Sequence, residues 1–443
     1  MKKLISLALM LVICITTASC GIISDISLMD HTLALAGEAK SVNYYNDYYK
    51  DDEYKTFLAK LEGFSARLSE KLCAEFGKEG NIVVSPISVY MALSLACECA
   101  EGETRQEILD AVGVTYDEVN RFTTKLYAFA NVEYRQMNAL GLPETVAFQE
   151  LTNSIWLDDS ISFKQNGVNK LAKEYNCDVY QSSFANGEAA KLINQYIKDK
   201  SRGLLDGDVQ LSPETYFVLM NTYYLKEIWN DTGKNLSLTE DKLYFQNSDG
   251  SMTHKQHLKG YYVDGKQFDG DRFTSFYTKT EHGFKIYFFV PDEEWRVDHI
   301  FTAENIQTVL SLEDWGYLDE ENRLLHHTRV IFPEFEAEFS EDIQDVLTRD
   351  FGISSIFDID KCKMTGVTDE AVFCNDVIHK AALKVDKTGI EGAAVTIMPM
   401  AGAAAPPPYE HVYHDFHVFR NFGFVITDPC GTVVFSGVIN TIE

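Results

Sequence analysis

The second half of this 443-residue chain is crowded with strand-forming segments, and this distribution limits the folds that the chain can adopt. Aromatic and β-branched residues, which favour strands, dominate the segments NSIWLDD (153–159), FVLMNTYYLKEIW (217–229), FKIYFFVPD (284–292), TRVIFPEFEAEF (328–339), FGFVITD (422–428) and GTVVFSGVIN (431–440). Helical patterns dominate the first half. This order of elements predicts an α+β domain of mixed topology.

Two helices stand out in the first half. Apolar residues recur at intervals of four and three from Phe57 to Phe76, which is the period of an amphipathic helix with one buried face. From Asn81, NIVVSPISVYMALSLA begins with a short strand-like run, and Pro86 suits the first turn of the nearly all-apolar helix that follows. We find no internal repeat and no second domain boundary in the sequence.

The charge balance excludes one large class of partner. The chain has 67 acidic and 39 basic residues, a formal net charge of -28. Nucleic-acid binding needs a positive surface, so we expect no nucleic-acid partner. The sequence has no glycine-rich phosphate loop or dinucleotide fingerprint, and we expect no cofactor. The cysteines show no CxxC spacing, and we expect mostly buried free thiols rather than disulfides or a zinc site.

The N-terminus has the pattern of a targeting segment. Lys2 and Lys3 precede the apolar run LISLALMLVICI, which is too short for a stable membrane span. The sequence TTASC then resembles a bacterial lipoprotein signal, in which Cys20 becomes the lipidated first residue. An ordinary secretory signal is the alternative, because Thr17 stands where leucine is usual.

This pattern predicts three segments: a signal peptide over residues 1–19, a spacer over 20–53 and one folded domain over 54–443. The domain would be held on the extracellular face of a membrane by the lipid on Cys20, or secreted if the lipoprotein signal is not used.

Residues 386–410, DKTGIEGAAVTIMPMAGAAAPPPYE, are unusually apolar and small-sided for a connection between two strands. Alternate residues of an extended chain share one face. Every second residue from Ile390 to Met400 would therefore lie on one uncharged face, and Glu391 would lie on the other. Such a segment can enter a sheet as an extra strand without a steric clash, and Thr388–Gly389 supplies a flexible entry. The alternative is a merely flexible surface loop.

Several motifs, in the right order, resemble those of the serpin family of serine protease inhibitors. NIVVSPISVYMALSLACECAEGETRQEIL from Asn81 is similar to the family's N-terminal helix motif. VIHKAALKVDKTGIEGAAVT from Val377 resembles the segment that enters its reactive-centre loop, and FHVFRNFGFVITDPCGTVVFSGVIN from Phe416 resembles its C-terminal signature. The resemblance runs from about residue 55 to the end of the chain.

The resemblance implies a serpin fold, in which helices pack around three β-sheets and the reactive-centre loop is exposed. A target protease cuts this loop, which then inserts into the central sheet and traps the acyl-enzyme. The implied hinge of the loop consists of Gly389, Ile390, Glu391, Gly392, Ala393, Ala394, Val395 and Thr396. The scissile bond is expected between Ala403 and Ala404, with Met400 as the second choice and Gly402 as the third.

Alanine before the bond suits elastase-like or subtilisin-like serine proteases, whereas trypsin-like enzymes need a cation there. We therefore expect a monomeric, irreversible inhibitor of such proteases, without catalytic residues of its own. One alternative is a non-inhibitory serpin that is cut as a substrate or acts as a binding protein. Another is a lipoprotein that binds small solutes, which the loop disfavours. A Ser/His hydrolase is disfavoured because the sequence has no GxSxG elbow.

The resemblance also implies a polar cluster of Ser85, Ser88, Asn221 and His379 beneath the part of the sheet that opens, with Trp229 near the upper mouth of the opening. Buried polar groups of this kind must be hydrogen-bonded, and they can exchange partners when strands part. The alternative interpretation is static core packing.

Three positions depart from the family pattern. Ile390 replaces the usual threonine at the hinge, where an apolar residue can be buried. Lys387 stands where the family prefers an acidic residue that braces the top of the sheet. Two outcomes are possible. Lys387 forms an ion pair with Glu341 or Asp342, with the charges reversed relative to the family pattern, or the sheet opens too readily. Pro399 lacks the N–H group that a strand ladder needs, so we expect the last part of loop insertion to be imperfect.

His411, His414 and His417 are spaced by three and could be taken for a metal site. In an extended segment this spacing alternates between faces, so the three side chains cannot converge. We therefore expect surface histidines and no metal site along this segment.

Overall fold

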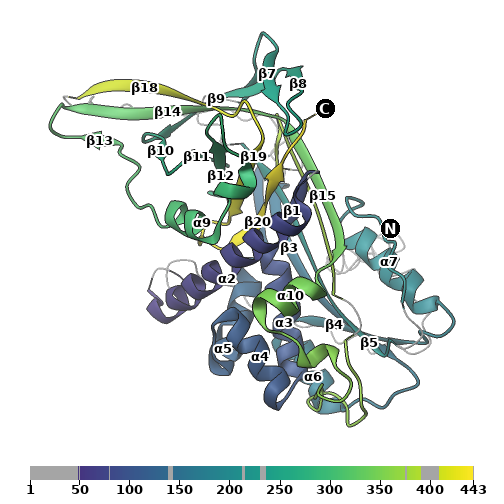
Figure 1. Cartoon of the computed structure of the whole chain (residues 1–443). Coiled ribbons are helices and arrows are strands. Elements are labelled where there is room, and N and C mark those ends of the chain that lie inside the picture. The colour runs from purple at the N-terminus through teal and green to yellow at the C-terminus, as the bar shows by residue number, and fades with distance from the viewer. Residues whose placement is uncertain are drawn as a thin grey trace, which may run out of the picture.

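The computed structural model describes residues 48, 50–78, 80–137, 143–211, 215–229, 236–374, 377–390 and 409–442. The α-helices α3 to α6 gather at one end of the molecule together with β4, and most of the other strands occupy its middle and its other end (Figure 1). The helices are α2 (Asp52–Phe76), α3 (Pro86–Cys99), α4 (Gly102–Val112), α5 (Tyr116–Phe129), α6 (Gln165–Glu174), α7 (Glu188–Lys200), α8 (Val297–Ile300), α9 (Ala303–Leu310), α10 (Gln344–Phe351) and the short 3₁₀ helix η3 (Ser355–Phe357).

The two helices predicted from the sequence are confirmed. α2 begins after Asp51, whose carboxylate accepts a hydrogen bond from the backbone N–H of Tyr54 and so caps the helix. Its apolar residues from Phe57 onward face the core. α3 begins with Pro86 in its first turn, where the missing N–H costs nothing.

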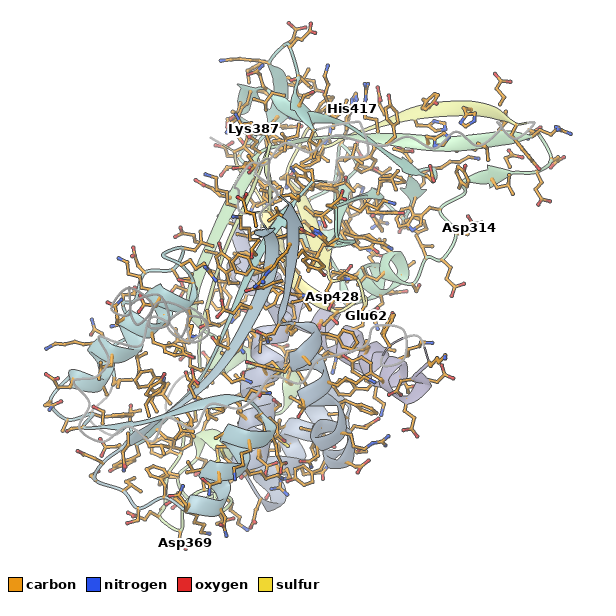
Figure 2. The ribbon with its side chains drawn as sticks, turned by 180° about the vertical axis from the view of Figure 1, so that it is seen from behind. Glu62, Asp314, Asp369, Lys387, His417 and Asp428 are labelled. Carbon is orange, nitrogen blue, oxygen red and sulfur yellow. The ribbon has the colours of Figure 1, made fainter. Side chains whose placement is uncertain are left out.

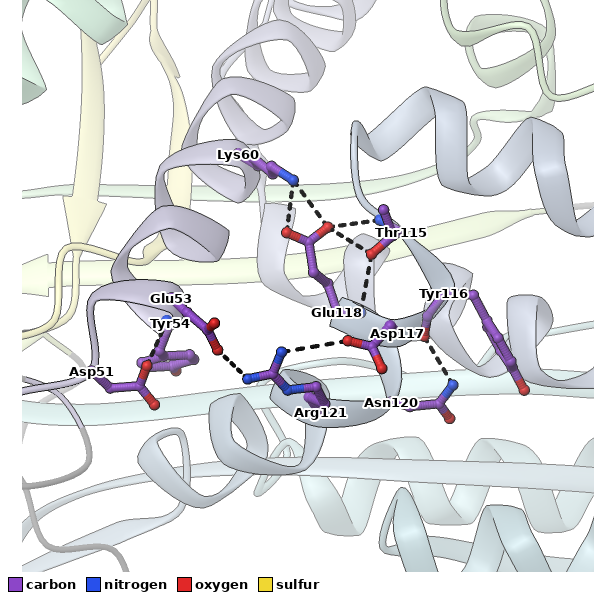
Figure 3. Close-up of polar contacts among 10 residues, drawn as sticks. All are labelled: Asp51, Glu53, Tyr54, Lys60, Thr115, Tyr116, Asp117, Glu118, Asn120 and Arg121. Atoms are coloured by element: carbon purple, nitrogen blue, oxygen red, sulfur yellow. Dashed lines mark hydrogen bonds and ion pairs between the residues drawn. The ribbon is translucent and has the colours of Figure 1, made fainter.

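The start of α2 is fastened to α5 by charged side chains (Figure 3). The Lys60 ammonium lies 2.7 Å from the Glu118 carboxylate, and Arg121 of α5 forms an ion pair with Glu53. Glu118 also completes a capping box with Thr115, because each side chain accepts a hydrogen bond from the other's backbone N–H. These contacts hold the start of α2 against α5.

The described residues form a seven-stranded central sheet in which β17 lies between β16 and β5. Its order is β15-β16-β17-β5-β3-β2, and β4 pairs with the far half of β3. The strands are β15 (Phe335–Asp342), β16 (Ile378–Asp386), β17 (Gly389–Ile390), β5 (Phe217–Ile228), β3 (Pro143–Asp158), β2 (Val132–Met137) and β4 (Cys177–Ser182).

Two further large sheets, as far as the chain is described, pack near one end of the central sheet. One has the order β1 (Ile82–Val84), β20 (Val433–Ile439), β19 (Phe422–Thr427), β12 (Lys285–Pro291), β11 (Phe273–Lys279) and β10 (Phe268–Asp269). The other joins β13 (Leu318–Asp319), β14 (Leu324–Pro333), β9 (His257–Asp264) and β6 (Ser237–Leu238), with β18 (Glu410–His417) paired to β14. A small hairpin joins β7 (Leu243–Gln246) to β8 (Met252–Lys255).

The strand predictions are confirmed, with one difference. The segment TRVIFPEFEAEF is divided between β14, which ends at Pro333, and β15, which begins at Phe335. The two strands belong to different sheets. Proline cannot donate a hydrogen bond to continue a ladder, which explains why the chain leaves the first sheet at this residue.

The expectation about the thiols is also confirmed. Cys73, Cys97, Cys99 and Cys177 are buried free thiols. Burial raises the pKa of the Cys97 thiol to about 12, so this group is protonated and unreactive at neutral pH.

A glycine in β20 provides a test of this packing. A Cβ atom at Gly437 would lie 2.0 Å from the carbonyl oxygen of Ile82 and 2.8 Å from the Phe424 ring. Gly437→Ala should therefore lower the free energy of unfolding by about 1–3 kcal/mol, measured as a lower melting temperature by calorimetry. Gly80→Ala is the matched control, because a Cβ there meets nothing within 4 Å. Equal melting temperatures for the two variants would contradict the packing described for β20.

Candidate functional site: a strand position between β5 and β16

The candidate site is the position between β5 and β16 in the central sheet. β17 occupies only its upper end: Ile390 pairs with Val385 of β16 on one side and with Glu227 of β5 on the other. Gly389 pairs with Asp386 and Ile228 in the same way. Beyond Ile390, the described part of the chain contains no strand between β5 and β16. Gly389 and Ile390 of the hinge are therefore paired on both sides within the sheet.

Packing around β17 explains the two residues found there. A Cβ atom at Gly389 would lie 1.9 Å from the carbonyl oxygen of Glu227, so only glycine fits this close approach. Ile390 is fully buried, with 0% of its surface exposed. The expectation that an apolar residue can be buried at this point of the hinge is confirmed. The remaining hinge residues, Glu391 to Thr396, and the bond between Ala403 and Ala404 lie outside the described residues.

A cavity of about 190 Å³ lies along the lower part of the same position. It is lined by residues 217–224 of β5 and residues 378–382 of β16, with Ser85, Ser88 and Phe435 among the residues beneath them. β5 and β16 thus border a cavity at the place where an inserted strand would lie.

Three of the four residues predicted to form a polar cluster are brought together at this cavity. The backbone N–H of Ser85 donates to Nε2 of His379 at 3.0 Å. The Ser85 and Ser88 hydroxyl groups are 3.0 Å apart, and Ser85 also donates to the carbonyl oxygen of Val434 at 2.9 Å. The structure therefore brings Ser85, Ser88 and His379 together, and their role in strand opening stays a prediction.

Asn221 is separate from these three in its hydrogen bonding. It lines the same cavity, but its side-chain amide donates to the carbonyl of Thr152 at 3.1 Å and to Asn153 at 2.8 Å. Within the described residues, its side-chain oxygen is buried without a hydrogen-bond partner. A buried acceptor of this kind is costly, and it is available to a donor that enters between β5 and β16.

His379 is held in the neutral state. Its Nε2 atom accepts a hydrogen bond from Ser85, so the proton of the neutral ring is on Nδ1. Burial of the ring lowers the pKa of His379 to about 4. Protonation would place a charge under the sheet and remove the acceptor that Ser85 uses.

Trp229 lies at the upper mouth, as predicted. Its indole N–H donates to the carbonyl oxygen of Asp386 at 2.7 Å, which links the end of β5 to the end of β16. The ring is buried and packs edge-on against Phe332, with 5.9 Å between the ring centroids.

The expected ion pair of Lys387 with Glu341 or Asp342 is wrong. β15 runs antiparallel to β16, so Glu341 pairs with His379 and Asp342 with Ile378, near the other end of β16. The nearby acidic residue is Glu334, whose carboxylate accepts a hydrogen bond from the backbone N–H of Lys387 at 3.0 Å. Figure 2 shows Lys387 at the end of the molecule opposite Asp369.

One feature of the upper mouth was missed from the sequence. The carboxylate of Glu227 is buried directly beside β17, with 1% of the residue exposed. It lies 2.7 Å from Nδ1 of His282, accepts a 2.7 Å hydrogen bond from the Thr280 hydroxyl, and accepts another from the backbone of Ile228. The sequence did contain a signal: Glu227 is a charged residue near the end of the strand segment YYLKEIW.

The histidines of β18 lie as predicted along the strand but have partners that were not predicted. His411 and His414 point to opposite faces, and each meets a histidine of β14, at 2.8 Å from His327 and His326 respectively. His417 is exposed and packs against Phe419.

Comparison with known proteins decides the family. The family model for serpins (serine protease inhibitors) matches residues 59–442. The chain belongs to the serpin family. The family is described as one of serine protease inhibitors rather than of catalysts, which is consistent with a protein that is not an enzyme.

Individual relatives cover most of this serpin. It is 27% identical over 412 residues to a protein of Oryza sativa subsp. japonica named probable non-inhibitory serpin-Z9, covering 86% of each chain. It is 24% identical over 335 residues to the corticosteroid-binding globulin of Ovis aries, covering 74% of this chain and 73% of the relative. The native state of the thermophilic serpin tengpin superposes with a TM-score of 0.71 at 19% identity, covering 92% and 97% of the chains.

These likenesses establish the serpin fold and the family. The described helices include none with the length and apolar character of a membrane-spanning segment.

The neutral state of His379 predicts a pH dependence of stability. Because the folded-state pKa of about 4 is below the usual 6.5, the His379 contribution is complete above pH 6.5 and is lost as the pH falls towards 4. The loss amounts to about 3 kcal/mol. His379→Gln keeps an acceptor for Ser85 but does not titrate, so its melting temperature should fall less than that of the wild type between pH 6.5 and 4.

Asp428 has the opposite effect on the pH dependence of stability, and it is present in both the wild type and the His379→Gln variant. Burial raises the pKa of Asp428 to about 6, so its contribution grows as the pH falls, and it cancels in the difference between the two melting curves. Parallel pH profiles for wild type and His379→Gln would refute the assignment of a buried neutral imidazole.

Proposed function

We propose that the protein is an irreversible, suicide-substrate inhibitor of serine proteases that acts by loop cleavage and insertion between β5 and β16. This proposal rests on one observation. Gly389 and Ile390 are paired with both β5 and β16, directly above the cavity that these two strands border. An inserted strand would form backbone hydrogen bonds on both sides and remove apolar surface from water, at about 25 cal/mol per Å². The free energy of insertion would drive the trapping of the acyl-enzyme.

The proposed specificity is for small residues before the cut. The bond between Ala403 and Ala404 favours elastase-like or subtilisin-like enzymes, and residues 388–410 contain no lysine or arginine for a trypsin-like pocket. This part of the proposal rests on the sequence of the loop.

A non-inhibitory role is the second candidate. The names of two relatives favour it: one is called a probable non-inhibitory serpin and the other a corticosteroid-binding globulin. Two residues also depart from the family pattern: Lys387, next to the loop, and Pro399, within it. In this case the loop would be cut as a simple substrate, or the protein would bind a ligand.

We further propose that the protein acts as a monomer on the outside of a bacterial cell, anchored by lipid on Cys20. The basic start, short apolar run and TTASC sequence support this location. Secretion without an anchor is the outcome if an ordinary signal peptidase acts instead. Cys20 lies outside the described residues.

The first test separates inhibition from simple cleavage. The protein is incubated with an elastase and with a subtilisin, and the products are separated on denaturing gels. Inhibition predicts an SDS-resistant adduct with the protease and a released peptide that begins at Ala404. Complete cleavage without adduct would support the second candidate.

A pair of arginine substitutions tests insertion itself. Ala394 lies four residues after the buried Ile390, so period-two alternation places it on the inward face of an inserted strand. Ala394→Arg should abolish the adduct, while cleavage continues, because a charge would have to enter the core. Ala393→Arg is the matched control, since its side chain would face outward, and it should still form adduct. Equal adduct yields from both variants would exclude insertion in this register.

A third substitution tests the assigned bond. Ala403→Arg should redirect the protein from elastase-like enzymes to trypsin-like enzymes, because a cation would then occupy the position that their pocket recognises. The measurement is the rate of adduct formation with trypsin and with elastase. If trypsin still forms no adduct, or cuts elsewhere in the loop, the bond assignment is wrong.

A further inference from the structure

β18 carries histidine rings that reach across to β14. The two strands are parallel and run side by side (Figure 1), and Leu325 pairs with His411 while His327 pairs with Tyr413. His327 and His411 are therefore diagonal neighbours. Nε2 of His327 and Nδ1 of His411 are 2.8 Å apart, and the two rings are parallel to within 3°. Two imidazole nitrogen atoms thus face each other at the surface of this sheet.

Neighbouring side chains fix the orientation of His327. Nδ1 of His327 lies 2.8 Å from the carboxylate of Asp264, the last residue of β9. The ring also packs between Tyr317, edge-on, and Tyr413, nearly parallel. The carboxylate holds the proton of the neutral ring on Nδ1, so the lone pair is on Nε2, which faces His411.

We propose that His327 and His411 bind a divalent transition-metal ion such as Zn²⁺, with Asp264 as the carboxylate that orients His327. A carboxylate on the other ring nitrogen is the usual support of a metal-ligating histidine. Imidazole nitrogen binds Zn²⁺ at about 2.0–2.1 Å, so two ligands of a tetrahedral ion are about 3.3 Å apart. The nitrogen atoms need to separate by about 0.5 Å and to turn towards a common point. Because Tyr317 and Tyr413 pack against His327, this adjustment comes mainly from the exposed ring of His411.

The site would be an open one. Within the described residues no three histidine, cysteine or acidic side chains are grouped so as to hold a metal ion. His327 and His411 would therefore provide two ligands, and water would complete the coordination. On binding, the proton shared between the rings moves: His411 changes from its Nδ1–H to its Nε2–H form, and its Nδ1 lone pair becomes a ligand.

The opposite face of the same strands has a second histidine pair in a different electrostatic setting. Nδ1 of His326 lies 2.8 Å from Nε2 of His414. His326 is buried, and both Lys266 and Asp319 are close enough to act on it. Among the described residues, Nε2 of His326 has no hydrogen-bond partner, whereas Nδ1 of His327 is held by the Asp264 carboxylate. The structure thus contains its own control for the proposed site.

A metal ion at this site would tie β18 to β14. β18 is the first described element after the reactive-centre loop, and in the described part of the chain its strand partner is β14. Bound metal would stabilise the folded protein in which β18 is paired with β14, and the melting temperature of the protein would rise.

The test is isothermal titration of the untagged full-length protein with ZnCl₂, together with thermal melting at increasing Zn²⁺. The wild type should bind one ion that His411→Ala no longer binds, and Zn²⁺ should raise only the wild-type melting temperature. Asp264→Asn should weaken binding about 10–100-fold. His414→Ala, the control on the opposite face, should bind as the wild type does.

The proposal is overturned if the wild type takes up no Zn²⁺, if His411→Ala binds it as tightly as the wild type, or if His414→Ala loses binding. Circular dichroism at 25 °C checks the fold of each variant. His411→Asn provides a second variant that keeps a polar side chain at this exposed position, and it should also lose the bound ion.

Discussion

The central sheet is constrained by a strand position that the described chain fills only at one end. β5 and β16 are joined there through Gly389 and Ile390, and below these residues the two strands border a cavity of about 190 Å³. Backbone groups at the edges of such a position lack the partners that a full strand would provide. A segment with small and uncharged side chains on one face follows directly in the sequence. Its pattern fits the strand position that the described residues leave open between β5 and β16.

The loop is held at both ends by different sheets. Its first end is β17, in the central sheet, and its second end leads into β18, which pairs with β14 in another sheet. While the chain is intact, the loop stays attached to β18, which is paired with β14. This attachment restrains the insertion of further residues between β5 and β16. Cleavage removes this restraint. In the proposed mechanism the intact state is one of high free energy that is maintained kinetically. The polar groups of Ser85, His379 and Asn221 line the cavity that the entering strand would occupy.

The sequence predicted those parts of the structure that depend on local patterns or on motifs. The helix with its apolar period from Phe57, the helix that begins at Pro86 and the burial of Ile390 follow from periodicity, a first-turn proline and alternation. Features that depend on pairing between distant segments were not predicted. The error over Lys387 came from the unknown direction of β15, because antiparallel pairing places Glu341 at the far end of β16. The His327–His411 contact needs the parallel register of β14 and β18, which no local pattern reveals.

The most direct test of this account is the thermal stability of the protein before and after cleavage of the bond between Ala403 and Ala404. The account predicts that the cut protein melts at a markedly higher temperature than the intact one, because the freed loop completes the sheet between β5 and β16. An unchanged melting temperature after complete cleavage would contradict it, since the intact fold would then store no free energy for cleavage to release.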